Sequence, residues 1–106
     1  MQTLLVSRHL GTLDWFQRQG IAIDQTIAHL DVESVQPGDI VVGTLPIQLA
    51  AAVCAKGARY VHLEVNVPFE YRGRELSAAL LDQFNAKLTE FKVTPVESTD
   101  LIKMNF

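Results

Sequence analysis

Three consecutive side chains of unlike chemistry follow the first apolar run of this chain, Leu4–Val6. Ser7 offers a hydroxyl, Arg8 a guanidinium that can make paired hydrogen bonds to phosphate oxygens, and His9 an imidazole that titrates near neutral pH. Together these groups could bind an anion and move a proton beside it. A purely structural role for His9 is the alternative.

A second cluster follows another apolar run, Ile40–Val42. Gly43 would let a ligand approach the backbone, and Thr44 offers a hydroxyl that could also cap the next helix. The helix would open on Pro46, so the backbone N–H groups around Leu45 would favour an anion such as a phosphate. We therefore expect Gly43, Thr44 and Leu45 to bind a ligand. The alternative is a turn that only caps a helix.

Two further cations lie in the loop expected over residues 66–74. Arg72 and Arg74 flank Gly73, and Pro68 interrupts the same stretch. The two guanidinium groups could close over an anion from the end of the preceding strand. The alternative is a solvated turn that leads into a helix.

Strands alternate with helices along the chain, which predicts an α/β fold with a parallel sheet of about five strands and helices on both faces. Thr12 and Gly20 are the expected start and stop signals of the first helix, and Asp31 is the expected cap of a single turn. The expected strands are 2–6, 26–30, 39–42, 59–65 and 92–97; the expected helices are 11–18, 31–35, 46–56 and 75–91.

Two of these strands contain a continuous apolar run, as expected for central strands of a parallel sheet with both faces covered. They are the strands that contain Leu4–Val6 and Ile40–Val42. If they are neighbours, their carboxyl ends bring the Ser7–His9 cluster opposite Gly43 and Thr44. This edge is where α/β sheets bind their ligands.

The longest expected helix, 75–91, carries an apolar stripe at three- or four-residue spacing, with Ser77 as an alternative N-cap. Leu80 is expected in the core, Trp15 is expected to pack rather than bind, and Pro95 suggests an edge strand. Residues 1–97 are expected to form one domain and 98–106 a C-terminal tail. The stripe consists of Leu76, Leu80, Phe84, Leu88 and Phe91.

Composition narrows the classes of partner and setting. A net charge of −3 argues against duplex nucleic acid, and no apolar run reaches the roughly 18–20 residues of a membrane span. The start of the chain lacks the basic region of a secretory signal, and the lone Cys54 cannot close an intrachain disulfide, so we expect a cytoplasmic protein.

No metal or cofactor is expected from the residue types. His29 and His62 have no cysteine or acidic residue at the spacing of metal ligands, so no metal site is expected. No glycine-rich nucleotide motif is present, and no cofactor is expected.

A series of short motifs carries a resemblance to a known family. In their order along the chain they resemble the small Csx-sixteen family of CRISPR-associated proteins, over nearly the whole chain up to about Phe91. The tail 98–106 matches none of these motifs. The motifs are Ser7-Arg8-His9, Ala28-His29-Leu30-Asp31, the run from Gln36 to Pro46, Gly57-Ala58-Arg59-Tyr60 and Arg72-Gly73-Arg74-Glu75-Leu76-Ser77.

The resemblance implies a Rossmann-like domain that acts in type III CRISPR antiviral defence. Members of the family look like ring nucleases, which bind the second messenger cyclic tetra-adenylate and cleave it without a metal to linear products with a 2′,3′-cyclic phosphate. They typically act as homodimers with the ligand across the two-fold axis. The alternatives are a module that binds the messenger without cleaving it and an interaction protein of the CRISPR complex.

Chemistry and position suggest a role for each site residue in such a reaction. Arg8 and the N–H groups after Gly43 would stabilise charge on the phosphate, and His9 would transfer a proton. Ser7 would orient the ribose. Arg72 or Arg74 would clamp a phosphate from above.

Overall fold

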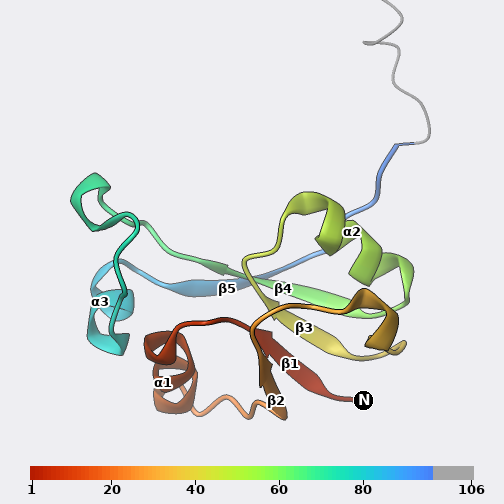
Figure 1. Ribbon diagram of the computed structural model, residues 1–106, viewed down its shortest axis with the longest axis horizontal. Coiled ribbons are helices and arrows are strands. Elements are labelled where there is room, and N and C mark those ends of the chain that lie inside the picture. The colour runs from red at the N-terminus through yellow and green to blue at the C-terminus, as the bar shows by residue number, and fades with distance from the viewer. Residues whose placement is uncertain (97–106) are drawn as a thin grey trace, which may run out of the picture.

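Five strands form one sheet in the order β2-β1-β3-β4-β5 in the computed structural model, which describes residues 1–96 (Figure 1). Strands β1 to β4 pair in parallel, whereas β5 runs antiparallel to β4. The expected α/β fold is confirmed, with the exception that the fifth strand is not parallel. The strands are β1 (Thr3–Val6), β2 (Gln25–Ile27), β3 (Ile40–Gly43), β4 (Arg59–Glu64) and β5 (Lys87–Phe91).

Helices cover both faces of the sheet, as the alternation predicts (Figure 1). Helices α1 (Leu10–Arg18) and α3 (Ala78–Gln83) pack together on one face, and α2 (Ile47–Ala55) lies on the other with the short 3-10 helix η1 (Val32–Ser34). A second 3-10 helix, η2 (Phe69–Tyr71), lies between β4 and α3.

Two buried clusters, one on each face, explain why consecutive residues of the central strands are apolar. Leu4 and Val41 belong to the α2 cluster, whereas their chain neighbours Leu5 and Val42 belong to the α1–α3 cluster. Trp15 lies in the second cluster and is 4% exposed, which confirms its expected packing role.

The expected adjacency of the first and third strands is confirmed. Strands β1 and β3 are neighbours, with Leu4 opposite Val41 and Leu5 opposite Val42. Because the two strands are parallel, their carboxyl ends lie at the same edge of the sheet. The residues that follow β1 and β3 therefore come together there.

The expected helix over 75–91 is wrong in its second half. Helix α3 ends at Gln83, Asn85 has a φ of 60°, and the chain then enters β5, which pairs with β4 from Glu64↔Lys87 to Tyr60↔Phe91. The expected strand over 92–97 is also wrong: residues 92–96 have no regular structure, and residue 97 lies outside the described residues, as does the tail 98–106.

Two expected helix caps are confirmed, and two other expected element ends are corrected. Ser77 caps α3 by accepting a hydrogen bond from the Leu80 N–H at 3.2 Å, and Asp31 caps η1. Thr12 lies inside α1, whose N-cap is His9, so the expected cap is wrong. Strand β2 ends at Ile27 rather than residue 30, because only three residues pair with β1.

Asp39 joins two segments at the amino end of β3. Its carboxylate oxygens accept hydrogen bonds from the backbone N–H groups of Gln2 and Gln36, both at 2.9 Å. Asp39 is only 5% exposed. The N–H group of Gln36, followed by that of Gln2, lowers the pKa of Asp39 below its ordinary value of 3.8. These bonds therefore stabilise the fold with the carboxylate ionised.

Asp39→Asn is expected to lower the melting temperature at pH 7, because an amide cannot accept both hydrogen bonds. A carboxyl with a depressed pKa contributes stability that is present above pH 3.8 and is lost as the pH falls toward the folded-state value. The difference between Asp39→Asn and wild type should therefore narrow below pH 3.8 in thermal melts. A constant difference at every pH would contradict this role.

Candidate functional site

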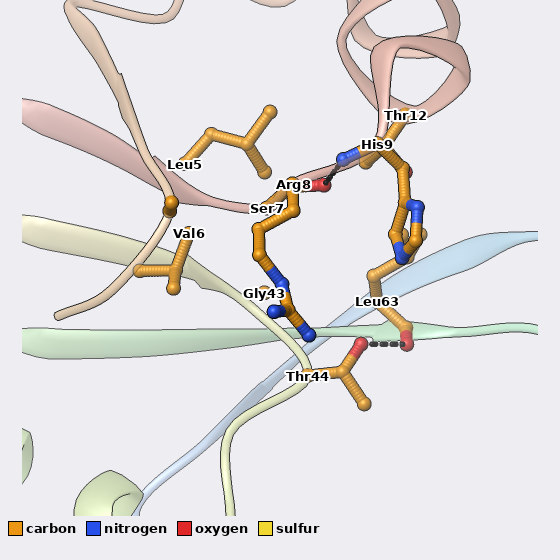
Figure 2. Close-up of a pocket in the computed structure, with 10 residues that line it drawn as sticks. Leu5, Val6, Ser7, Arg8, His9, Thr12, Gly43, Thr44 and Leu63 are labelled. Carbon is orange, nitrogen blue, oxygen red and sulfur yellow. Dashed lines mark hydrogen bonds between the residues drawn. The ribbon is translucent and has the colours of Figure 1, made fainter.

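The carboxyl ends of β1 and β3 line a cavity of about 290 Å³ at the edge of the sheet (Figure 2). Five of the residues expected to bind or react, Ser7, Arg8, His9, Gly43 and Thr44, lie around this one cavity. Its full lining is Leu5, Val6, Ser7, Arg8, His9, Thr12, Ala28, Gly43, Thr44 and Leu63.

The Ser7–His9 segment forms one wall of the cavity. Ser7 Oγ accepts a hydrogen bond from the His9 N–H at 3.1 Å, which leaves the Ser7 hydroxyl proton able to bond a ligand. The Arg8 guanidinium extends toward Gly43 and Thr44 (Figure 2). Within residues 1–96, Arg8 forms no ion pair, so its charge is available to an anion.

His9 has a partner that the sequence did not indicate. Its Nδ1 lies 2.6 Å from Glu75 Oε2, and Glu75 comes from the segment between η2 and α3. The two residues are 66 positions apart, and no local spacing signals such a contact. With Nδ1 held by a carboxylate, Nε2 is the ring nitrogen left to exchange a proton with a ligand.

Gly43 and Thr44 form the opposite wall. A Cβ on Gly43 would lie 2.9 Å from the Val6 carbonyl oxygen, so glycine here permits the close approach of β1 and β3. Thr44 Oγ1 donates a hydrogen bond to the Leu63 carbonyl at 3.5 Å and does not cap α2. Pro46, expected as the first helical residue, is instead the N-cap, and α2 begins one residue later at Ile47.

Leu45 lies outside the cavity, and its backbone N–H is not free. That N–H donates to the Tyr60 hydroxyl at 2.9 Å, which corrects the expectation of an open donor for an anion. The side chain of Leu45 lines a different hollow, of about 340 Å³, on the α2 face. Gly43 and Thr44 therefore border the cavity without Leu45.

The two loop arginines do not reach the cavity. Arg72 and Arg74 are exposed, and neither is among its lining residues. The Arg74 guanidinium lies 5.6 Å from the centroid of the Tyr71 ring instead, in a cation–π contact. In this structure neither residue therefore belongs to the cavity wall, and a clamp over an anion stays a prediction.

The Tyr60 hydroxyl forms hydrogen bonds with the backbone of the Gly43–Leu45 turn. Tyr60 is a second residue near the site that the sequence did not single out. Its hydroxyl accepts from the Leu45 N–H and lies 3.2 Å from the Gly43 carbonyl and 2.6 Å from His62 Nδ1. Burial raises the pKa of Tyr60, so the hydroxyl stays protonated and can donate to one of these acceptors. The sequence feature that points to Tyr60 is the alternation of Tyr60, His62 and Glu64 with apolar residues along β4.

Tyr60→Phe is expected to lower the free energy of unfolding by about 1–3 kcal/mol, because the Leu45 N–H and the Gly43 carbonyl lose their buried partner. Urea denaturation followed by circular dichroism measures the change. Tyr71→Phe is the matched control, since the Tyr71 ring packs on Phe84 and Arg74. Equal stability in Tyr60→Phe and wild type would show that the hydroxyl does not support the turn.

Residues 1–96 contain no group of three or more histidine, cysteine, aspartate or glutamate side chains arranged to hold a metal ion. No helix in the same residues is long and apolar enough to cross a membrane.

Comparison with known proteins identifies a family. No curated protein and no solved structure matches this chain. Residues 4–94 match the family model described as "Putative CRISPR-associated protein (Cas_VVA1548)". The matched segment includes Ser7–His9, Gly43, Thr44 and Glu75. Because the match covers most of its 106 residues, the chain belongs to the Cas_VVA1548 family of CRISPR-associated proteins.

Proposed function

We propose that this protein is a metal-independent ring nuclease of type III CRISPR defence that binds and cleaves cyclic tetra-adenylate in the cytoplasm. Membership of a CRISPR-associated family and the resemblance to the Csx-sixteen family support this role. The observation that carries the proposal is the cavity in which Arg8 and His9 lie beside Gly43 and Thr44. An anion-binding cation and a proton carrier meet there at the edge where α/β sheets bind ligands.

The reaction requires the attacking 2′-oxygen, the phosphorus and the leaving 5′-oxygen to lie in line. A ribose 2′-oxygen attacks the adjacent phosphorus, the bond to the 5′-oxygen breaks, and the product carries a 2′,3′-cyclic phosphate. The proton of the 2′-hydroxyl must leave and the 5′-oxygen must gain one. His9 Nε2 can exchange one of these protons, Arg8 can bind the phosphate oxygens, and the Ser7 hydroxyl can orient the ribose.

The size of the cavity supports a homodimer. At about 290 Å³ it lies just below the roughly 300–1,000 Å³ typical of small-molecule pockets, which suits one part of a ring of four nucleotides. Three large apolar side chains near this edge are at least 73% exposed. They belong to the first residues of the helices that follow β1, β3 and β4, namely Leu10 of α1, Ile47 of α2 and Phe69 of η2. A second copy that covers these side chains would complete a symmetric site for a symmetric ring.

A cleavage assay tests the proposal. The protein is incubated with cyclic tri-, tetra- or hexa-adenylate in the presence of EDTA, and the products are separated by chromatography. Linear products from the four-membered ring support the proposal. Intact ligand after stoichiometric binding would replace it with a sequestering role.

A thermal shift separates both outcomes from a pure interaction protein. A ligand at a hundredfold over its Kd stabilises the folded state by about 2.7 kcal/mol, whereas a protein without the site shows no shift. Size-exclusion chromatography with light scattering tests the dimer, and a monomer at assay concentration would overturn that part of the proposal.

Arg8→Ala is expected to weaken binding of cyclic tetra-adenylate about tenfold to a hundredfold, because hydrogen bonds to charged groups contribute roughly 1.5–3 kcal/mol each. Isothermal titration calorimetry measures the affinity. Arg18→Ala is the control for loss of a positive charge, since Arg18 lies in the last turn of α1 and pairs with Asp14 at 3.2 Å. Equal affinity in Arg8→Ala and wild type would remove Arg8 from the site.

A further inference from the structure

The contact between His9 and Glu75 joins the end of β1 to the segment that leads into α3. Their side-chain atoms lie 2.6 Å apart, and both side chains are more than half exposed. Exposed ion pairs contribute little to stability, so the fold does not depend on this pair. The position of the pair, with His9 on the cavity wall, points to a different role.

The backbone holds Glu75 close to His9 through a glycine contact. A Cβ on Gly11 would lie 1.9 Å from the Leu76 carbonyl oxygen, so only glycine at position 11 allows the two backbones to approach so closely. Gly11 lies in the first turn of α1, two residues after His9, and Leu76 directly follows Glu75. The approach of the two backbones places the carboxylate beside the imidazole.

Two further contacts fix the same pair of helices. Ser77 caps α3, which defines the direction of the chain just after Glu75. On the next turns, the Trp15 indole N–H donates to Asp82 at 2.7 Å, so α1 and α3 are bonded as well as packed. The segment that carries Glu75 is therefore anchored to the helix that begins at His9.

The carboxylate decides which ring nitrogen of His9 carries the proton. A carboxylate only accepts hydrogen bonds, so Nδ1 must carry a proton for the 2.6 Å contact to be a hydrogen bond. Neutral His9 is then the Nδ1–H tautomer, with the lone pair on Nε2. An unpartnered neutral imidazole favours the opposite tautomer, with its proton on Nε2.

We infer that Glu75 is the positioning residue of His9: it holds Nδ1–H so that Nε2 serves the reacting ribose or leaving oxygen. The catalytic part of this inference rests on the proposed function, whereas the tautomer does not. Glu75 itself stays outside the cavity, since it is not among the lining residues.

The first test is spectroscopic and needs no substrate. The ¹⁵N chemical shifts of the His9 ring are measured in wild type, Glu75→Ala and Glu75→Gln, above the pH at which the ring is protonated. We expect Nδ1–H in wild type, a shift toward Nε2–H in Glu75→Ala, and an intermediate state in Glu75→Gln, whose amide oxygen still accepts. Nε2–H in wild type, or equal spectra in all three proteins, would overturn the inference.

The second test separates positioning from binding. Cleavage of cyclic tetra-adenylate by Glu75→Ala should show a kcat lowered about 10- to 100-fold with KM changed less than about twofold, and Glu75→Gln should recover part of the loss. Glu70→Ala is the control, because Glu70 is an exposed acid in η2 on the same connection. Wild-type kcat in Glu75→Ala would overturn the catalytic role.

Failure of the proposed function and failure of the inference about Glu75 give different results in these two tests. If wild type does not cleave the ring, the proposed function fails while the tautomer measurement still decides whether Glu75 orients His9. If wild type cleaves and Glu75→Ala cleaves equally well, the proposed function stands and the inference about Glu75 is overturned.

Discussion

His9→Ala is expected to slow the cleavage of cyclic tetra-adenylate about 10²–10⁴-fold, the range typical for loss of a general acid or base. His9 lies on the cavity wall with Nδ1 held by Glu75, and we propose Nε2 as the atom that carries the proton. In the proposed site Arg8, not His9, binds the phosphate, so the affinity of His9→Ala for the intact ring should change little. Single-turnover kinetics measures the rate, and calorimetry measures the affinity.

His29→Ala is the control for the removal of a histidine side chain. His29→Ala removes an exposed imidazole that lines a different hollow, and it should cleave at the wild-type rate. Imidazole added to His9→Ala should restore part of the activity. Full activity in His9→Ala would end the proton-transfer role, and an equal loss of rate and affinity would assign His9 to binding alone.

The central part of the fold could be predicted because its strands are buried on both faces. Leu4 and Leu5 point to opposite clusters, as do Val41 and Val42, so consecutive residues in the middle of both strands must be apolar. That pattern fits no exposed strand, and it identified β1 and β3 as central. Their adjacency then brought two predicted clusters to one cavity.

The region after Gln83 could not be predicted because its apolar spacing fits two structures. Leu80, Phe84 and Leu88 recur every four residues, as on a helix. The chain turns at Asn85 in a left-handed conformation, and Leu88 then pairs opposite Leu63 of β4. Pairing with a distant strand overrides local periodicity, and the periodicity itself carries no trace of it.

The parts of the site that were missed depend on long-range contacts of the same kind. Glu75 meets His9 across 66 positions, and Tyr60 meets Leu45 across 15. Gly43 was expected to admit a ligand, yet its lack of a side chain already serves the approach of Val6. Residue types indicated which groups could react, whereas their partners depend on the packing of α3 and β4.

Leu81→Asp is expected to unfold the protein. Leu81 is 3% exposed and lies in the cluster with Trp15 and Phe16 between the sheet and the α1–α3 pair. An ionised carboxylate buried there without a partner costs several kcal/mol, and cavity formation adds to that cost. The sum reaches the roughly 5–15 kcal/mol by which domains are stable. Circular dichroism and proton NMR should show loss of helix signal and of chemical-shift dispersion.

Leu80→Asp is the matched control, because it makes the same substitution one position earlier. A continuous helix over 75–91 predicts Leu80 in the core, whereas in α3 it is only half-buried and Leu81 is the buried residue. Leu80→Asp should therefore remain folded with a lowered melting temperature. The reverse result, a folded Leu81→Asp and an unfolded Leu80→Asp, would mean that α3 presents a different face to α1. The placement of Glu75 beside His9 would then fail with it, since both follow from the same packing of α3 on α1.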